Sequence, residues 1–516
     1  MDTHFTIKLG NVWLYLSGPM SEALRKQIQS KLSFVVPGFK YTPTYKAMVE
    51  RAEKEGRPVE WDGTKTLARM TQYGLRCPSG LLSYIKEMFT ERKITWEFEE
   101  YRSPIVRTEG WSVEGFSLFD YQDPPNQEIK ERKRGVLEMS TGGGKTELMI
   151  KNIVDVASFP AVFYVPNTDL LRQTHARFAK YVRYNGQPAD IGMVGDGHYD
   201  IRPITICTVQ MAQIALEGKF TKYEFDDEGR KEKKIRVPDE QRDRIADMVR
   251  TAQYVYIDEC QHVSSDTIQS VLNNSHGARF RIGGSASPWR DDGLDILIEA
   301  CFGKRLCKVD ASFLIRRDPP RLIRPQITFN HFRWFLGHVA NYQELYTRFV
   351  VENDARNEWI AQRAQYHVGL GRPTIILVKW ARHASILKEL IPGSEVLTST
   401  GDDATTAKQR KLVLDRMRER KLMCIIGTTL LDEGIDIPSA GAGIFAGAGK
   451  SSTRALQRVG RFIRVDPNDP DKKIAYIEEF YDHCRWLNQH AQARRRIYET
   501  EPEFQISDNA DPLGVK

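Results

Sequence analysis

The sequence contains no pair of cysteines at Cys-x-x-Cys spacing and no cluster of histidine and cysteine at metal-ligand spacing, although seven cysteines are present. We therefore expect free thiols and no zinc centre. No apolar run approaches the roughly 18 residues that a membrane-spanning helix needs, and the N-terminus lacks the basic-then-apolar layout of a secretory signal. These absences predict a soluble, cytoplasmic protein with no membrane partner.

An excess of charge of one sign is also lacking, because 75 lysines and arginines are balanced by 68 aspartates and glutamates. The formal net charge of +7 permits a polyanionic partner without requiring one. No repeat of fixed period and no low-complexity tract occurs, which excludes solenoids and propellers. A composition of 41% hydrophobic and 28% charged residues is typical of a folded globular protein, and 516 residues predict several domains.

From about Gly135 onward, short β-rich runs alternate with longer helical patterns, which predicts βαβ units and parallel sheets. The first series of predicted strands comprises residues 161–165, 204–208, 254–257 and 282–283. The second series follows Arg324 and comprises residues 373–378, 395–397, 423–427 and 443–445. The segment before Gln122 has turn signals and a helical pattern from Leu81 to Phe89. The predicted fold class is α/β, with two tandem parallel-sheet domains preceded by a small α+β domain.

The expected domain boundaries follow from these changes of pattern. We predict an N-terminal domain, a first α/β domain, a linker, a second α/β domain and a C-terminal tail, at residues 1–106, 107–309, 310–325, 326–490 and 491–516. The linker contains Pro319-Pro320, which suits a chain that crosses between two sheets. A charged stretch from Lys219 to Arg242 is predicted to form a surface hairpin or loop.

The strongest local signal is the run Ser140-Thr141-Gly142-Gly143-Gly144-Lys145-Thr146, which predicts a phosphate-binding loop between a strand and a helix. Glycines let backbone N–H groups approach phosphate oxygens, and the helix N-terminus contributes its positive dipole end. We expect Lys145 to reach the β and γ phosphates of ATP and Thr146 to bind Mg²⁺ through its hydroxyl. Met139 stands where the strict pattern has its first glycine.

A pair of carboxylates follows the predicted strand 254–257. Asp258 and Glu259 should emerge at the carboxyl end of that strand, beside the phosphate loop. Asp258 is then a candidate to hold Mg²⁺ and Glu259 a candidate to orient or deprotonate the attacking water.

These motifs resemble those of superfamily 2 helicases, and further motifs follow in the order of that family from Tyr121 to Arg464. The resemblance implies two RecA-like domains that bind ATP and Mg²⁺ and move along a nucleic acid. It implies that Tyr121 and Gln122 read the adenine, although Phe119 stands where the family has arginine. It also implies that Gly434 and Asp436 contact the nucleotide.

The resemblance assigns roles to several more residues. Arg461 and Arg464, predicted on one helical face, would reach the γ-phosphate from the second domain together with Gln457. Ser285 and Ser287 would couple hydrolysis to strand movement, with Gln261 hydrogen-bonded toward their segment. The residues that would contact the nucleic acid are Pro166, Asn167, Arg172, Gln173, Thr208, Gln210 and Thr428.

The sequences of residues 283–293 and 194–197 resemble those of the XPB-related branch of the superfamily, which includes phage recombination helicases. Short N-terminal motifs, such as Trp61-Asp62-Gly63, resemble the substrate-binding domain of a phage helicase of this kind. This implies an ATP-dependent DNA helicase of a bacterial or phage-infected cell. Its substrate would be branched or forked DNA, in fork regression, Holliday-junction branch migration or R-loop unwinding.

A single-strand-binding or recombination protein is a candidate partner of such an enzyme. Three alternatives stay open. The chain could be a duplex-DNA translocase subunit that works with a nuclease, or an RNA helicase. It could also be a DNA-binding scaffold without catalysis, which the presence of the catalytic residues disfavours.

Overall fold

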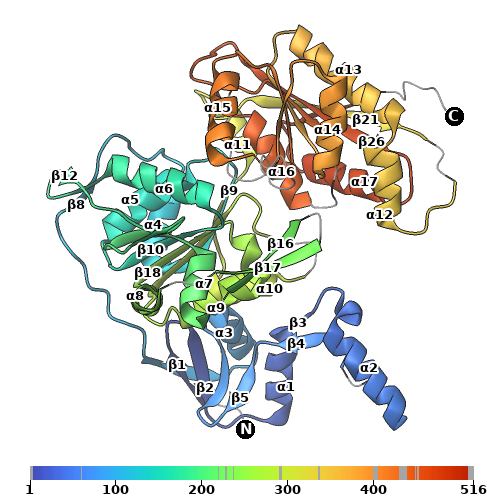
Figure 1. Cartoon of the computed structure of the whole chain (residues 1–516). Helices are drawn as coiled ribbons and strands as arrows, with labels where there is room; N and C mark the ends of the chain where they lie inside the picture. Colours follow the sequence, from blue (N-terminus) through green and yellow to red (C-terminus); the bar gives the residue numbers. More distant parts are fainter. Residues whose placement is uncertain are drawn as a thin grey trace. The chain divides into compact units, whose positions relative to one another are not determined.

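The computed structural model describes residues 4–59, 61–218, 220–226, 229–235, 238–289, 293–334, 337–398, 405–428, 439–447, 449 and 452–509. They form two compact units (Figure 1). The first unit comprises residues 1–139, 145–222 and 233–308, and the second comprises 140–144, 223–232 and 309–516. Within the described ranges, no helix is both long and apolar enough to cross a membrane.

The N-terminal domain is a five-stranded sheet in the order β5-β6-β2-β1-β7. The strand β1 pairs antiparallel with β2 and parallel with β7. Every second side chain of β1 is buried, namely Phe5, Ile7 and Leu9, because the strand presents one face to the core. The strands are β1 His4–Leu9, β2 Trp13–Ser17, β5 Arg69–Thr71, β6 Gly74–Pro78 and β7 Thr95–Glu100.

Two helices, α1 (Glu22–Lys31) and α3 (Leu82–Glu91), contribute to the core of this domain through residues such as Leu24 and Phe89. The helical pattern predicted for Leu81 to Phe89 is therefore confirmed. A separate extension contains the two-stranded sheet of β3 (Ser33–Val35) and β4 (Thr64–Thr66) and the helix α2 (Pro43–Glu55).

The first α/β domain is built on an eight-stranded sheet in the order β14-β13-β15-β10-β18-β19-β9-β20. The neighbours from β13 to β9 pair in parallel, as the alternation of strands and helices predicts. The strands are β9 Arg134–Met139, β10 Ala161–Val165, β13 Gly192–Gly195, β14 His198–Asp200, β15 Ile204–Thr208, β18 Tyr254–Asp258, β19 Phe280–Ser285 and β20 Arg305–Val309.

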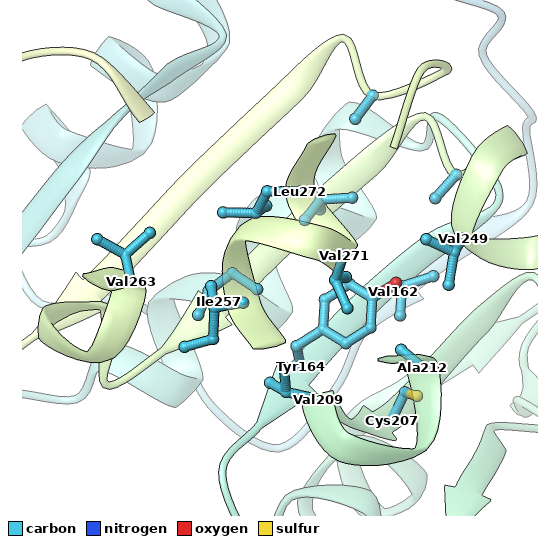
Figure 2. Close-up of a cluster of buried hydrophobic side chains, with 14 of the residues drawn as sticks. Val162, Tyr164, Cys207, Val209, Ala212, Val249, Ile257, Val263, Val271 and Leu272 are labelled. Atoms are coloured by element: carbon cyan, nitrogen blue, oxygen red, sulfur yellow. The ribbon is translucent and has the colours of Figure 1, made fainter. Parts of the chain in front are cut away.

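The helices of this domain cover both faces of the sheet (Figure 1). Figure 2 shows one face, where Tyr164 of β10 lies among side chains such as Val209 and Val271 of the covering helices. On the other side of β10, Phe163 packs edge-to-face on Phe178 of α6. The helices are α4 Asp123–Arg132, α5 Lys145–Val156, α6 Thr168–Tyr181, α7 Val209–Glu217, α8 Asp239–Thr251, α9 Asp266–Asn274 and α10 Asp295–Phe302.

Two small sheets lie outside the large ones. The strands β8 (Trp111–Val113), β11 (Val182–Tyr184) and β12 (Gln187–Pro188) form one of them. The strands β16 (Phe220–Asp226) and β17 (Gly229–Ile235) pair with each other, so the charged stretch contains the predicted hairpin.

The N-terminal domain is docked on the first α/β domain through the short helix η2 (Ser79–Leu81) and α10. A methyl group on Gly80 would lie 2.2 Å from the carbonyl oxygen of Glu299, so the two backbones touch at this glycine. Arg134 at the start of β9 donates to Ser79 Oγ at 2.8 Å and to the carbonyl oxygen of Asn11 at 2.8 Å. The N-terminal domain is thus packed on the sheet that carries the phosphate loop.

The second α/β domain is a seven-stranded sheet in the order β23-β24-β22-β25-β26-β21-β27, and all its pairings are parallel. The strands are β21 Arg324–Phe332, β22 Thr374–Leu377, β23 Glu395–Leu397, β24 Cys424–Gly427, β25 Ala442–Phe445, β26 Ile474–Asp482 and β27 Gln505–Asn509. The helices are α11 Ala311–Arg316, α12 Tyr342–Leu345, α13 Asp354–Gly369, α14 Ala381–Leu390, α15 Ala407–Arg418, α16 Ser452–Phe462 and α17 Leu487–Tyr498, with the π-helical turn η4 at Tyr346–Val351.

The predicted C-terminal tail from residue 491 needs correction. The helix α17 continues to Tyr498, and β27 pairs in parallel with β21, which makes residues up to Asn509 part of the second sheet. The predicted linker 310–325 likewise contains α11, whose first backbone N–H groups at Ala311 and Ser312 donate to the carboxylate of Glu501. The sequence pattern did not predict β27. This strand lies at the edge of the sheet, and its residues are mostly polar, so they lack the apolar run that indicates a buried strand.

Candidate nucleotide and nucleic-acid site

The phosphate loop follows β9 and leads into α5, as predicted. Gly142 and Gly144 have φ angles of +85° and +79°, a backbone conformation that glycine adopts without steric cost. The N–H of Gly143 donates to the carbonyl oxygen of Ser140 at 3.0 Å, which closes the turn. Lys145, the first residue of α5, donates from Nζ to the carbonyl oxygen of Met139 at 2.6 Å. Its ammonium group therefore lies at the carboxyl end of β9, and Thr146 follows it in the first helical turn.

The carboxylate pair emerges two strands away in the same sheet, at the end of β18. Burial and the charge of Glu259 raise the pKa of Asp258 to about 7, and the ammonium of Lys145 opposes both effects. The side chains of Lys145 and Asp258 are therefore electrostatic neighbours. This convergence of a lysine and two carboxylates is the arrangement that the two motifs predicted.

Glu259 has a φ angle of +54°, which is uncommon for a residue with a side chain and marks a constrained position. Its Oε2 accepts a hydrogen bond of 2.9 Å from Nε2 of Gln261. The amide thus orients the carboxylate that we expect to act on water. The predicted hydrogen bond from Gln261 toward the Ser285–Ser287 segment stays a prediction.

The residues at this sheet end fit a Mg²⁺ ion that is shared with a nucleotide. The described residues contain no group of three His, Cys, Asp or Glu side chains that could hold a metal by themselves. Mg²⁺ usually takes only one or two carboxylates and completes its shell with phosphate oxygens and water. Asp258 and Thr146 could supply the protein ligands, and a divalent cation would offset the burial and the charge of Glu259 that raise the pKa of Asp258.

The segment predicted to couple hydrolysis to movement follows β19, the strand between β18 and β9. Ser285 is fully buried, and its Oγ accepts from the N–H of Ser287 at 3.1 Å. The Oγ of Ser287 is buried without a hydrogen-bond partner in the part of the chain that the structure describes. Glu138 of β9 accepts from Trp289 Nε1 at 2.8 Å, which ties this segment to the strand before the phosphate loop. No sequence motif indicated a role for Glu138.

The predicted adenine-reading residues precede α4. Gln122 is 1% exposed, and its Oε1 accepts from the N–H of Phe119 at 2.9 Å. The rings of Phe119 and Tyr121 stack, with centroids 5.7 Å apart and an interplanar angle of 1°. The role of Gln122 and Tyr121 at adenine stays a prediction.

The predicted nucleic-acid residues of the first domain gather at the carboxyl ends of β10 and β15. Asn167 begins α6 as its N-cap, with its side chain accepting from the N–H of Leu170 at 2.9 Å. Gln210 donates from Nε2 to the carbonyl oxygen of Pro166 at 2.8 Å, which joins the two motifs. Thr208 is buried, and Gln173 lies in α6.

Arg172 is half-exposed and pairs with Asp196, whose Oδ2 is 2.5 Å from its guanidinium. Asp196 has a φ angle of +54° and belongs to the turn after β13. In the sequence, Asp196 stood out only as part of the Val194–Gly197 motif. The sequence did not predict that it would pair with Arg172. The pair holds the guanidinium at the sheet edge.

In the second domain, α16 carries Gln457 and Arg461 and ends at Phe462. Arg464 lies beyond the helix and forms an isolated β-bridge with Leu322. The expectation that Arg461 and Arg464 share one helical face is therefore wrong, because the chain leaves the helix between them. Thr428 is buried at the end of β24. Gly434 and Asp436 lie outside the described residues.

Comparison with known proteins places both α/β domains in one superfamily. Residues 91–290 match the family model described as "Type III restriction enzyme, res subunit", and residues 358–466 match the "Helicase conserved C-terminal domain". Together they cover more than half of the chain. The chain belongs to superfamily 2 of the helicases. Its two tandem parallel sheets are RecA-like domains, as the motifs predicted.

Several curated proteins resemble this superfamily 2 helicase. The "DNA 3'-5' translocase XPB2" of Sulfurisphaera tokodaii is 22% identical over 435 residues, which cover 76% of this chain and 88% of that protein. The "DNA 3'-5' helicase XPB" of Kineococcus radiotolerans is 21% identical over 357 residues, which cover 68% and 58%. The chain spans less than two thirds of the length of this bacterial protein and of two further curated relatives.

A solved structure with a TM-score above 0.5 has the same fold. The type ISP restriction-modification enzyme LlaBIII bound to DNA matches 78% of this chain and 32% of its own, with 15% identity and a TM-score of 0.51. The crystal structure of T4 UvsW covers 98% of this chain and 99% of its own, with 17% identity and a TM-score of 0.42.

Proposed function

We propose that this superfamily 2 helicase is an ATP-dependent DNA helicase or translocase that acts on branched DNA. The observation that carries the proposal is the convergence of Lys145, Asp258 and Glu259 at the carboxyl end of one parallel sheet. A phosphate loop beside two carboxylates is equipped for phosphoryl transfer to water, because it can hold the phosphates and activate the nucleophile.

In the proposed reaction, the backbone N–H groups of residues 140–144 and the ammonium of Lys145 bind the phosphates of ATP. Glu259, held by the amide of Gln261, accepts a proton from the attacking water. A bound Mg²⁺ would neutralise charge on the β and γ phosphates, with Asp258 and Thr146 as its protein ligands. Arg461 and Arg464 would stabilise the charge that develops on the γ-phosphate.

The assignment of DNA rests on the curated relatives, two of which carry the names of DNA 3'-5' motors of the XPB type. The residues at the ends of β10 and β15, such as Asn167 and Arg172, offer backbone amides, side-chain amides and a guanidinium to phosphodiester oxygens. Preference for branched DNA rests on the N-terminal domain and its extension, where Lys40 and Lys65 add positive charge. A single-strand-binding or recombination protein remains a proposed partner.

ATP hydrolysis by the full chain tests the proposal, with single strands, duplex, forks, four-way junctions and RNA as stimulants. We expect forks and junctions to give the largest stimulation. Arg461→Ala and Arg464→Ala should lose hydrolysis by roughly 10³-fold or more while nucleotide affinity is kept. Lys145→Ala should lose both. Equal stimulation by all nucleic acids would refute the preference for branched DNA, and hydrolysis that survives Lys145→Ala would refute the site.

The specificity test should use point variants of the N-terminal domain. Deletion of the domain would expose the apolar surface around η2 and leave Arg134 without Ser79 and Asn11, so loss of activity could reflect misfolding. Reversal of charge at Lys40 and Lys65 keeps the docked interface. We expect weaker fork binding and a salt slope that is lower by about 0.9 for each lost phosphate contact, with unchanged basal ATPase.

A duplex translocase subunit that works with a nuclease is the second candidate. The match of residues 91–290 to a restriction-enzyme subunit favours it. This candidate predicts that the protein displaces a triplex-forming strand from duplex DNA without separating the duplex. It also predicts nuclease activity only after a partner protein is added, and both results together would favour it over a helicase.

A further inference from the structure

A cavity of about 200 Å³ lies between the N-terminal domain and the first RecA-like domain, away from the nucleotide residues. Arg69 and Arg76 line it from β5 and β6, and Arg281 lines it from β19. The amides of Gln269 and Asn273 on α9 complete its polar wall. No aspartate, glutamate or histidine is among the residues that line it.

The three arginines have no carboxylate partner within the described ranges. Arg69 and Arg76 stand directly opposite each other on adjacent antiparallel strands, a like-charge pairing that is unfavourable without a counter-ion. Arg76 is held over the ring of Trp13, with its guanidinium carbon 4.5 Å from the ring centroid. Two like charges thus converge on one cavity.

Arg281 is 2% exposed and has only backbone carbonyl partners. It donates to Leu272, Ser275 and Cys301 at 2.9, 3.2 and 3.2 Å. Burial lowers the pKa of Arg281 to about 10, and burial together with the charge of Arg281 lowers the pKa of nearby Arg134 to about 9. Burying a guanidinium is costly unless negative charge is close, so this cavity favours an anion.

We infer that the cavity is a binding site for a phosphate group. Guanidinium forks match the oxygens of phosphate and bind them in pairs, and the side-chain amides of Gln269 and Asn273 can donate the remaining hydrogen bonds. The phosphate can come from a DNA backbone or from a free phosphorylated small molecule, because both present the same oxyanion.

An occupied site would connect the N-terminal domain to the ATPase motifs. Arg281 lies on β19, which ends at Ser285, and Gln269 lies on α9, which follows the segment after Glu259. An anion held between Arg76 and Arg281 would strengthen the contact between the two domains, because it would attract a positive charge of each domain.

The test measures the thermal unfolding midpoint of the full chain against inorganic phosphate at constant ionic strength. A non-hydrolysable ATP analogue with Mg²⁺ saturates the phosphate loop, so that phosphate cannot act there. The test variants are Arg69→Ala and Arg76→Gln, separately and together. Arg92→Ala is the matched control, because Arg92 is an exposed arginine of the same domain that does not line the cavity.

We expect phosphate to raise the midpoint of the wild type and of Arg92→Ala, and calorimetry to show at least tenfold weaker phosphate binding for each cavity variant. If duplex DNA competes with phosphate for the wild type but not for the double variant Arg69→Ala/Arg76→Gln, the ligand is a phosphate of the DNA backbone. Independent binding of phosphate and DNA identifies a free small molecule. Equal phosphate responses of the double variant and Arg92→Ala would overturn the inference.

Discussion

The close backbone contact at Gly80 makes the docking of the N-terminal domain a sharp test of the structure. A Cβ atom at this position would lie 2.2 Å from the carbonyl oxygen of Glu299 and 2.5 Å from that of Ala300. Ordinary contact needs at least 3.4 Å. Both neighbours are backbone atoms of α10, so Gly80→Ala should force η2 and α10 apart by about 1 Å, with the cost of an overpacked core.

Overpacking of this kind costs about 1–3 kcal/mol. In a unit of this size each kcal/mol lowers the unfolding midpoint by about 2–4 °C. We expect Gly80→Ala to lower the midpoint of the full chain accordingly and to speed proteolytic cleavage of the connection between β7 and β8, because the N-terminal domain leaves its docked position more often.

Gly369→Ala is the control for this prediction. Gly369 ends α13 in the second domain, and a methyl group there would meet nothing within 4 Å. The unfolding free energy of Gly369→Ala should stay within about 0.5 kcal/mol of that of the wild type, and its midpoint should change little. If Gly80→Ala behaves like Gly369→Ala in both assays, the described contact between η2 and α10 is incorrect.

Three further predictions concern single side chains. Glu259→Gln should lower ATP turnover by about 10²–10⁴-fold in a steady-state assay while ATP binding persists, and near-normal turnover would exclude Glu259 as the base. Arg172→Ala should weaken DNA binding and reduce the salt slope by about 0.9 for duplex, whereas an unchanged slope in a salt titration would leave Arg172 with only its structural pair to Asp196. Burial and the charge of Arg356 lower the pKa of His383 to about 3, so the folded chain leaves this histidine neutral while the unfolded chain protonates it below about pH 6.5. Between about pH 6.5 and pH 3, stability should therefore fall by about 1.4 kcal/mol for each pH unit in denaturant titrations, and His383→Gln should flatten this part of the profile.

The central strands of both sheets could be predicted because they are buried on both faces. The predicted strands 161–165 and 204–208 coincide with β10 and β15, and the predicted strand 423–427 contains β24. Continuous β-branched runs of this kind indicate a parallel sheet directly. The edge strand β27 has no such signal, since its register is set by β21 rather than by its own residues.

The nucleotide residues were predictable because each lies in a contiguous motif at a strand end. The contacts that position them come from distant parts of the chain and have no local pattern. Glu138 reaches Trp289 across 151 positions of sequence, and Arg134 reaches Asn11 across 123. The end of α16 before Arg464 was missed because a helical spacing of three continues in the sequence after the helix has stopped.

The strand β9 has a second task besides presenting the phosphate loop. Its first residue, Arg134, is bonded to the N-terminal domain, and its last residue, Met139, accepts from Lys145. The six-residue strand β9 therefore connects the N-terminal domain, with any ligand bound to it, directly to the phosphate loop that we expect to bind ATP. A force on the N-terminal domain would therefore reach the phosphate loop through the strand β9 itself, without a flexible segment between them.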